Sequence, residues 1–156
     1  MIMSKKLDRI DLRLLSLLQR DARISNAQLA DKVSLSPTAC LRRLRNLENE
    51  GWISHYSAVL DEKMLGFQIA AMVFVKLEKN TKHNGDAFEE ALLQLPQVIE
   101  CCVVTGAHDY VLRVVSKNLE DYERLLKEGI AAVDVVADLE SLIILNQSIK
   151  HKELPL

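Results

Sequence analysis

Apolar and polar positions in the first sixty residues repeat with the period of an α-helix. The first apolar stripe consists of five residues at helical spacing: Leu7, Ile10, Leu14, Leu17 and Leu18. Asp8 stands just ahead of it, where an N-cap residue accepts hydrogen bonds from the first turn. The pattern therefore predicts a helix that ends near Arg20.

Two further helix starts follow. Ser25 and Gln28 have the spacing of a capping box, and a short apolar face comes directly after them. Ser36 has the chemistry of an N-cap residue, and Pro37 occupies the first helical position, where its missing N–H costs nothing. We expect this third helix to run to Glu50, followed by a glycine cap at position 51.

The period changes in the rest of the chain. Alternation over 53–60 predicts a short strand, and 61–67 reads as a linker. Beyond it we expect strands at 68–78, 98–105, 110–115 and 139–145, and helices at 84–95 and 118–132. This order is the βαββαβ of a ferredoxin-like domain. The predicted fold is α+β, with a three-helix helix-turn-helix domain over 1–60 and a second, ferredoxin-like domain over 68–156.

The first strand of the second domain is apolar on both faces. Two helices cover only one face of a four-stranded sheet, although Ala70, Met72 and Phe74 would lie on the other. The simplest cover is the same surface of a second copy, so we expect a homodimer.

Charge separates the two halves. Residues 1–60 carry ten Lys or Arg and six Asp or Glu, whereas the remainder carries ten and sixteen. The first half therefore suits a polyanion. A signal peptide and a membrane span are not expected, which predicts a cytoplasmic protein. Cys40, Cys101 and Cys102 form no C-x-x-C pair, and we expect them to be reduced, mostly buried thiols rather than metal ligands.

Only Ser34 and Leu35 separate the second and third helices, as in helix-turn-helix units. Spacing places Cys40, Leu44 and Leu47 of the third helix toward the core. Candidate contacts to double-stranded DNA are the outward residues Ser36, Thr38, Ala39, Arg42, Arg43, Arg45 and Asn46. The first three would approach base edges, with the arginines dividing between bases and phosphates. The alternative is a solvated charged face.

The chain resembles the Lrp/AsnC (feast/famine) transcriptional regulators over essentially its whole length. The resemblance is carried by Leu7-Asp8 with Asp11, Asp21-Ala22-Arg23-Ile24-Ser25, Leu29-Ala30, Leu35-Ser36 with Arg43, Leu47-Glu48, Gly51, Val104-Thr105-Gly106, Asp109-Tyr110 and Leu154-Pro155-Leu156. It implies a sequence-specific DNA-binding regulator whose second domain dimerises through its sheet. It further implies assembly to a higher oligomer, often an octamer, and an amino-acid effector.

The resemblance also implies an effector site. Its candidate residues are Thr105, Gly106, Ala107, His108, Asp109 and Ser141. Exposed amides of the loop would meet a carboxylate, and Asp109 an ammonium group. The alternative is an ordinary hairpin turn. The chain departs from the family pattern at 133–136, where Val-Asp-Val-Val stands in place of Leu-Pro-Gly-Val, so the effector's identity stays open.

Two rival functions share this architecture. One is an enzyme of the sirohaem decarboxylase type, but the chain contains no conventional catalytic motif, and its four histidines are scattered. The other is an effector-sensing protein without a DNA function, which a complete helix-turn-helix argues against. We therefore expect no enzyme activity, cofactor or metal.

Overall fold

The computed structural model describes residues 6–150 and 152–156, which form two compact units. The N-terminal unit spans 1–59 and also takes in 149–156, whereas the second unit spans 60–148. Sequence analysis assigned the C-terminal residues to the second domain. In the structure they lie against the N-terminal helices, because the Gln19 side chain bonds both backbone groups of Leu154.

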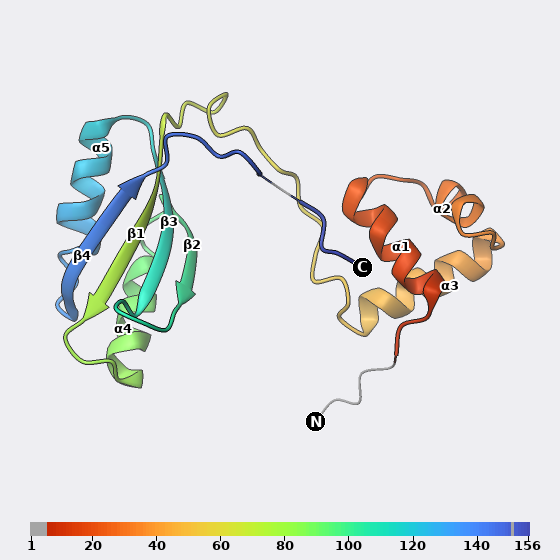
Figure 1. The fold of residues 1–156 in the computed structure, drawn as a ribbon, viewed down its shortest axis with the longest axis horizontal. Helices are drawn as coiled ribbons and strands as arrows, with labels where there is room; N and C mark the ends of the chain where they lie inside the picture. Colours follow the sequence, from red (N-terminus) through yellow and green to blue (C-terminus); the bar gives the residue numbers. More distant parts are fainter. Residues whose placement is uncertain (1–5, 151) are drawn as a thin grey trace. The chain divides into compact units, whose positions relative to one another are not determined.

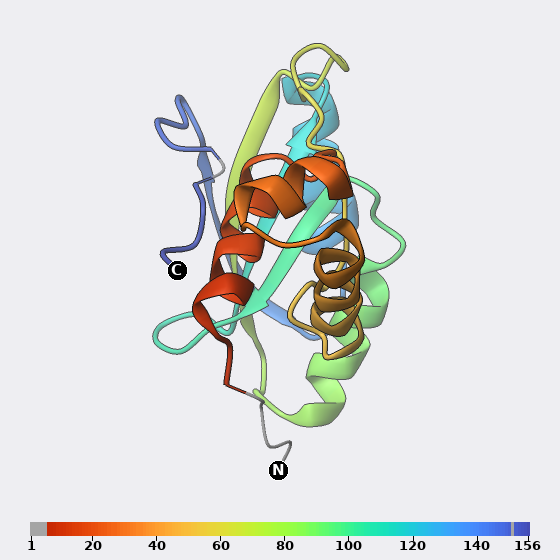
Figure 2. The ribbon, with the colours of Figure 1, turned by 90° about the vertical axis from the view of Figure 1, so that its right-hand side faces the viewer.

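Three helices build the N-terminal unit (Figures 1 and 2): α1 (Arg9–Arg20), α2 (Asn26–Lys32) and α3 (Pro37–Asn49). The N-caps are the predicted Asp8, Ser25 and Ser36, and the first two form capping boxes. Each cap bonds N–H groups that the helix itself leaves unpaired. The core of the unit is mainly leucine from α1, together with Leu29, Cys40 and Leu47.

The predicted strand over 53–60 is wrong for this chain. The segment has no regular structure; Val59 and Leu60 are largely exposed, and Tyr56 is about half exposed. A strand needs a neighbour to accept its hydrogen bonds, and none of the described residues pairs with this segment.

The second unit has the predicted βαββαβ order. Its elements are β1 (Ile69–Leu77), α4 (Lys82–Leu92), β2 (Val98–Val103), β3 (Tyr110–Ser116), α5 (Leu119–Arg124), the π-helical turn η1 (Leu125–Ile130) and β4 (Val136–Ile143). The four strands are antiparallel neighbours in the order β2-β3-β1-β4. The helix expected to continue to residue 132 instead widens into η1, where the Ala131 N–H reaches back to the Leu126 carbonyl.

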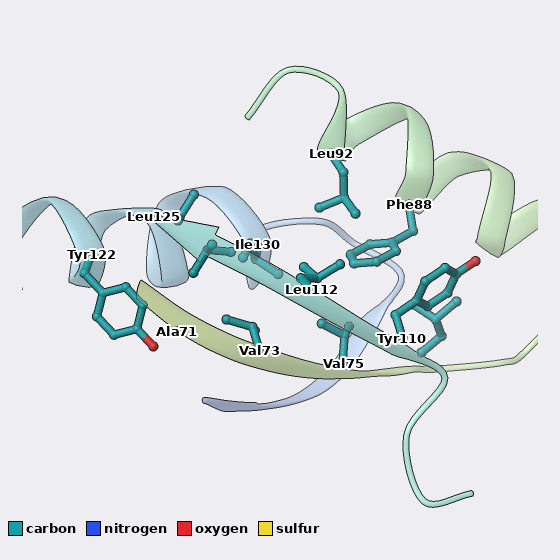
Figure 3. Close-up of a cluster of buried hydrophobic side chains, with 12 residues drawn as sticks. Ala71, Val73, Val75, Phe88, Leu92, Tyr110, Leu112, Tyr122, Leu125 and Ile130 are labelled. Carbon is teal, nitrogen blue, oxygen red and sulfur yellow. The ribbon is translucent and has the colours of Figure 1, made fainter. Parts of the chain in front are cut away.

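One face of the sheet packs against the helices of its own unit (Figures 1 and 2). Ala71, Val73 and Val75 of β1 meet Phe88 of α4 and Ile130 of η1 in the core shown in Figure 3. Alternation sends the intervening residues of β1 to the opposite face. There Met72 and Phe74 are half-buried, and no described helix of this unit contributes to their burial.

Candidate nucleic-acid interface and effector loop

The turn between α2 and α3 is closed by backbone bonds. The Leu35 N–H donates to the Ala30 carbonyl and the Ser34 N–H to that of Asp31, with Ser34 at a left-handed φ of 57°. This is the glycine position of a Schellman cap, occupied in this chain by serine. On the far side of the turn, Asn26 Nδ2 donates to the Pro37 carbonyl at 2.9 Å. These contacts fix where α3 begins.

Helix α3 has a buried face and an exposed face, as its spacing predicts. Cys40 and Leu47 are buried and Leu44 packs against the same cluster. Burial raises the pKa of the Cys40 thiol. The residues exposed on or just before the helix are Ser36, Thr38, Arg42, Arg45 and Asn46, and Ala39 is half-buried. Five of the seven residues predicted to contact DNA are therefore exposed, whereas Ala39 and Arg43 are half-buried.

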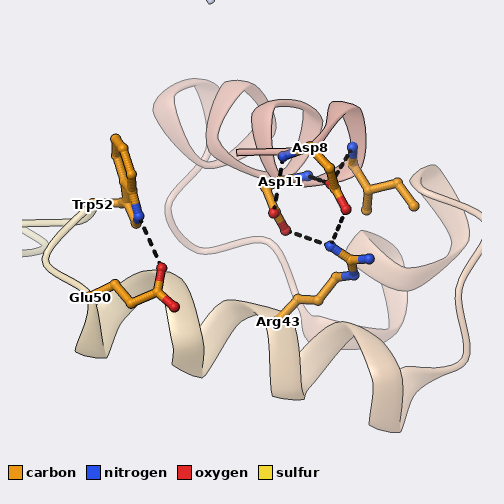
Figure 4. A network of polar contacts seen from close by, with 6 residues as sticks. Asp8, Asp11, Arg43, Glu50 and Trp52 are labelled. Atoms are coloured by element: carbon orange, nitrogen blue, oxygen red, sulfur yellow. Dashed lines mark hydrogen bonds and ion pairs between the residues drawn. The ribbon is translucent and has the colours of Figure 1, made fainter. Parts of the chain in front are cut away.

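Arg43 is held by two carboxylates of the same unit (Figure 4). Its Nη1 lies 2.7 Å from Asp8 Oδ2 and 2.8 Å from Asp11 Oδ1. The backbone N–H of Asp11, followed by Arg43 itself, lowers the pKa of the Asp8 carboxyl. Sequence analysis grouped Arg43 with the DNA contacts. Within the described chain, Arg42 and Arg45 form no such ion pair.

The C-terminal end of α3 is joined to the segment that follows it. Tyr56 donates its hydroxyl to Glu48 at 3.0 Å, and Trp52 donates its indole N–H to Glu50 at 3.2 Å (Figure 4). Burial, followed by the Glu48 contact, raises the pKa of Tyr56 to about 12. These contacts were not predicted from sequence, where the available signal was two aromatic residues, Trp52 and Tyr56, close after Gly51.

A cavity of about 510 Å³ lies in the N-terminal unit between α1, the segment after α3 and the chain end. Leu15 and Leu18 of α1 line it with Trp52, Leu154 and Leu156. The Leu154 N–H donates to Gln19 Oε1 at 2.7 Å, and Arg20 pairs with Glu153 at 3.0 Å. Leu154, Pro155 and Leu156 thus form part of the N-terminal unit.

The predicted effector loop connects β2 to β3. The Val104 N–H donates to the Asp109 carbonyl, and Gly106 adopts a φ of 122°, which only glycine takes without strain. Residues 105–107 are exposed and His108 is half-buried. No hydrogen bond within the described chain uses the N–H groups of residues 105–108. The loop therefore presents a run of free donors.

Asp109 is buried and already fully engaged. Its Oδ2 accepts the Leu77 N–H at 2.9 Å, and its Oδ1 lies 2.7 Å from Asn80 Nδ2 and 3.4 Å from Lys76 Nζ. The Leu77 N–H, with the nearby Lys76 charge, holds the pKa of this carboxyl below its usual value. Asp109 thus ties the loop to the end of β1. Its contact with an effector ammonium group stays a prediction.

His108 and Ser141 belong to different faces of the sheet. The His108 ring lies 5.4 Å from that of Phe74, and its Nε2 is 3.6 Å from Glu140 Oε2. Ser141 pairs with Val73, whose side chain is in the helix-covered core. Within one chain, the predicted effector residues 105–109 therefore lie in one loop, whereas Ser141 lies on the other face of the sheet.

Residues 6–150 and 152–156 contain no cluster of three or more His, Cys, Asp and Glu side chains fit to hold a metal ion. Over the same residues, every helix is too short or too polar to cross a membrane. Cys101 and Cys102 are exposed on edge strand β2, so the expectation of buried thiols holds only for Cys40.

Comparison with known proteins accounts for both units. Residues 7–54 match the model of a winged helix-turn-helix DNA-binding domain, and residues 70–154 match that of the Lrp/AsnC ligand binding domain. In the described part of residues 7–54 the structure has helices but no strand.

Two curated relatives align over nearly the whole chain. The Bkd operon transcriptional regulator of Pseudomonas aeruginosa is 42% identical over 97% of this chain and 99% of its own length. The leucine-responsive regulatory protein of Escherichia coli is 35% identical over 92% and 87%.

Solved structures agree with these relatives. A transcriptional regulator from Neisseria meningitidis, solved as its complex with L-Met, superposes with a TM-score of 0.91 at 28% identity, covering 96% of this chain and 97% of that one. An AsnC family transcriptional regulator from Agrobacterium tumefaciens gives 0.88 at 32%, with the same coverage. The chain belongs to the Lrp/AsnC family of DNA-binding transcriptional regulators.

Proposed function

We propose that α3 lies in the major groove of duplex DNA and reads its sequence. Its first turn approaches base edges through Ser36, Thr38 and Ala39, and Arg42, Arg45 and Asn46 contact bases and phosphates further along. The observation that carries this assignment is the exposed pair of guanidinium groups, Arg42 and Arg45, which no described carboxylate neutralises. A helix of this length, about 20 Å at 1.5 Å per residue, fits the groove.

The experiment is a selection of bound fragments from genomic DNA at near-physiological salt, followed by binding titrations on a recovered site. Replacing a phosphate-contacting arginine by alanine reduces the slope of log K against log salt by about 0.9. We expect that change for Arg42→Ala or Arg45→Ala. Lys117→Ala, at an exposed position of the second unit, is the control and should leave the slope unchanged. Recovery of no fragment above random would refute the assignment.

We further propose that the protein acts as a homodimer that buries the open face of the sheet, and that dimers assemble further. Support comes from Met72, Phe74 and Val111, apolar residues on the face that carries no described helix of the same unit. Arg113 on this face is paired with Glu62 at 2.7 Å. Burial of the face in a dimer would therefore not leave the Arg113 charge without a partner. A symmetric dimer would read two half-sites about 34 Å apart or a multiple of that.

An amino acid is the proposed effector, bound at the loop 105–108. The free N–H groups of this loop suit a carboxylate, because backbone donors converging on an anion form charge-assisted bonds. Two similar proteins support the ligand class: one is named leucine-responsive, and another was solved with L-Met. Asp109 fixes the shape of the loop through its bonds to Leu77 and Asn80.

Calorimetric titration with each amino acid and with its carboxamide tests this assignment. If the loop binds the carboxylate, an amino acid that binds will lose at least about tenfold in affinity as the carboxamide, since a charged hydrogen bond contributes about 1.5–3 kcal/mol. Equal affinity for acid and amide would exclude the loop as a carboxylate site. Ser141→Ala in the same assay shows whether a residue from the other face takes part.

A further inference from the structure

The contact between α1 and α3 at Arg43 joins a side chain of α3 to the start of α1. Both carboxylates that bind Arg43 are themselves fixed by the helix N-terminus. Asp8 Oδ1 accepts the N–H groups of Ile10 at 2.9 Å and Asp11 at 2.8 Å, and Asp11 Oδ2 accepts the Asp8 N–H at 3.3 Å. Arg43 is therefore linked to the backbone of α1 through the hydrogen-bonded carboxylates of Asp8 and Asp11 (Figure 4).

We propose that Asp8, Asp11 and Arg43 form a clasp that sets the rotation of α3 about its own axis. In this arrangement Arg43 is a positioning residue for DNA reading rather than a contact to phosphate or base. The inference rests on the DNA-binding role of α3 and adds the device that orients it.

The position of Arg43 on the helix suits this role. Cys40, Leu44 and Leu47 face the core, and Arg42 and Arg45 face outward. At about 100° per residue, Arg43 lies on the flank between these faces. Its side chain is 32% exposed and that of Asp11 only 15%. An ion pair on the flank adds a directional restraint to the non-directional apolar packing of the core face.

The ends of α3 are held elsewhere. Asn26 bonds the carbonyl of Pro37 at the start, and Tyr56 bonds Glu48 near the end. These contacts fix where the helix begins and ends along its axis. Contacts on the flank of α3 control how far the helix is rotated, and so where Thr38, Arg42 and Asn46 point relative to a groove. Among the described residues, the ion pair on this flank is that of Arg43 with Asp8 and Asp11.

Electrostatics argues against a direct phosphate contact by Arg43. Moving the guanidinium to DNA would leave Asp8 and Asp11 without a counter-charge next to a polyanion. With the clasp closed, Arg43 neutralises one of the two carboxylates, and the N-terminal dipole of α1 favours both. The same residues that orient α3 thus reduce the repulsion between DNA and the start of α1.

The direction in which Asp11→Asn changes DNA affinity distinguishes a positioning role of the clasp from a simple charge effect. Asp11→Asn removes a negative charge near the DNA, so long-range electrostatics alone tightens binding. The clasp predicts the opposite, about tenfold weaker specific binding, comparable to the loss of one base-pair contact. Asp31→Asn, at an exposed position on α2, is the matched control and should leave affinity unchanged or raise it.

A second readout uses salt. Arg43→Ala should weaken specific binding while the slope of log K against log salt stays that of the wild type, whereas Arg42→Ala reduces the slope by about 0.9. Tighter or unchanged binding by folded Asp11→Asn, or a reduced slope for Arg43→Ala, overturns the clasp. If Asp11→Asn does not fold, Asp8→Asn gives the same test, because asparagine caps a helix as well as aspartate. Failure of the wild type to bind any duplex would instead refute the proposed function.

Discussion

The hydroxyl oxygen of Tyr110 lies 2.8 Å from the point that a Cβ atom on Gly85 would occupy. Gly85 is inside α4, where glycine is otherwise unfavourable. Tyr110 is buried against Phe88, with ring centroids 4.9 Å apart, and donates its hydroxyl to Glu89 at 3.0 Å. The ring therefore has little room to move, and the helix must approach β3 without a side chain at this position.

Gly85→Ala is accordingly expected to lower the free energy of unfolding by about 1–3 kcal/mol, the usual cost of overpacking a core, despite alanine's better helix propensity. Urea unfolding at fixed protein concentration measures it. In a Tyr110→Phe background the clash is removed, and the same substitution should be neutral or stabilising. An equal cost in both backgrounds would contradict the assignment to the hydroxyl.

Ser34 occupies a position that suits glycine. A φ of 57° costs a non-glycine residue about 1–2 kcal/mol of strain. Glycine avoids this strain but loses more chain entropy on folding, which offsets about half of the gain. Ser34→Gly should therefore raise the free energy of unfolding by up to about 1 kcal/mol, whereas Ser34→Val should lower it. Ala27→Gly in α2 is the control and should cost about 1 kcal/mol. Thermal unfolding of all three variants decides the point, and destabilisation by Ser34→Gly would argue against backbone strain at this turn.

Local features of this chain were predictable because they depend on neighbouring residues. The caps Asp8, Ser25 and Ser36 bond groups two or three positions away, so their chemistry is legible in sequence. The βαββαβ order followed from changes of period. The left-handed φ at Gly51 was predictable for the same reason, because a glycine directly after a helix commonly forms its C-terminal cap.

Contacts between distant residues were not predictable in this way. Asp8 is 35 positions from Arg43. The spacing of α3 places Arg43 on the flank of the helix, but it does not show that Asp8 and Asp11 lie opposite that flank. Asp109 looked like a ligand because it follows an exposed turn, yet its carboxylate meets Leu77, 32 positions earlier. The strand expected over 53–60 failed for a related reason, since alternation predicts a pairing surface but not the presence of a partner.

The hydrogen bond from the Leu77 N–H to the Asp109 carboxylate, with the nearby Lys76 charge, predicts a dependence of stability on pH. The pKa of Asp109 in the folded protein is below the usual 3.8, so the ionised form stabilises the fold at pH values above 3.8. This contribution is lost as the pH falls below that value. Asp109→Asn should cost about 1.5–3 kcal/mol at pH 7, since it removes charged hydrogen bonds from a buried site, and the difference from wild type should shrink toward pH 3. Exposed Asp134→Asn is the control, and a difference that does not change with pH would contradict ionisation of Asp109 as the cause.

The chain end should stabilise the N-terminal unit through Gln19, whose amide bonds both backbone groups of Leu154. Gln19→Ala removes both bonds and should lower stability by about 1 kcal/mol. Hydrogen exchange at the Leu154 amide should then become as fast as in an unstructured peptide. Glu153→Ala breaks only an exposed ion pair and should leave that amide protected. Unchanged protection in Gln19→Ala would show that the bond does not form in solution.

The open face of the sheet gives the sharpest test of assembly. Met72 is half-buried there between β3 and β4, opposite Arg113 and Leu142. Met72→Asp would place a second carboxylate beside Arg113, which already pairs with Glu62, leave excess negative charge in the proposed dimer interface and raise the dissociation constant by about two orders of magnitude. Leu93→Asp, 82% exposed after α4 and away from this face, is the control. Sedimentation velocity distinguishes the results. A dimer that survives Met72→Asp but not Leu93→Asp would move the interface to the helix side, because only a buried surface makes a charged side chain costly.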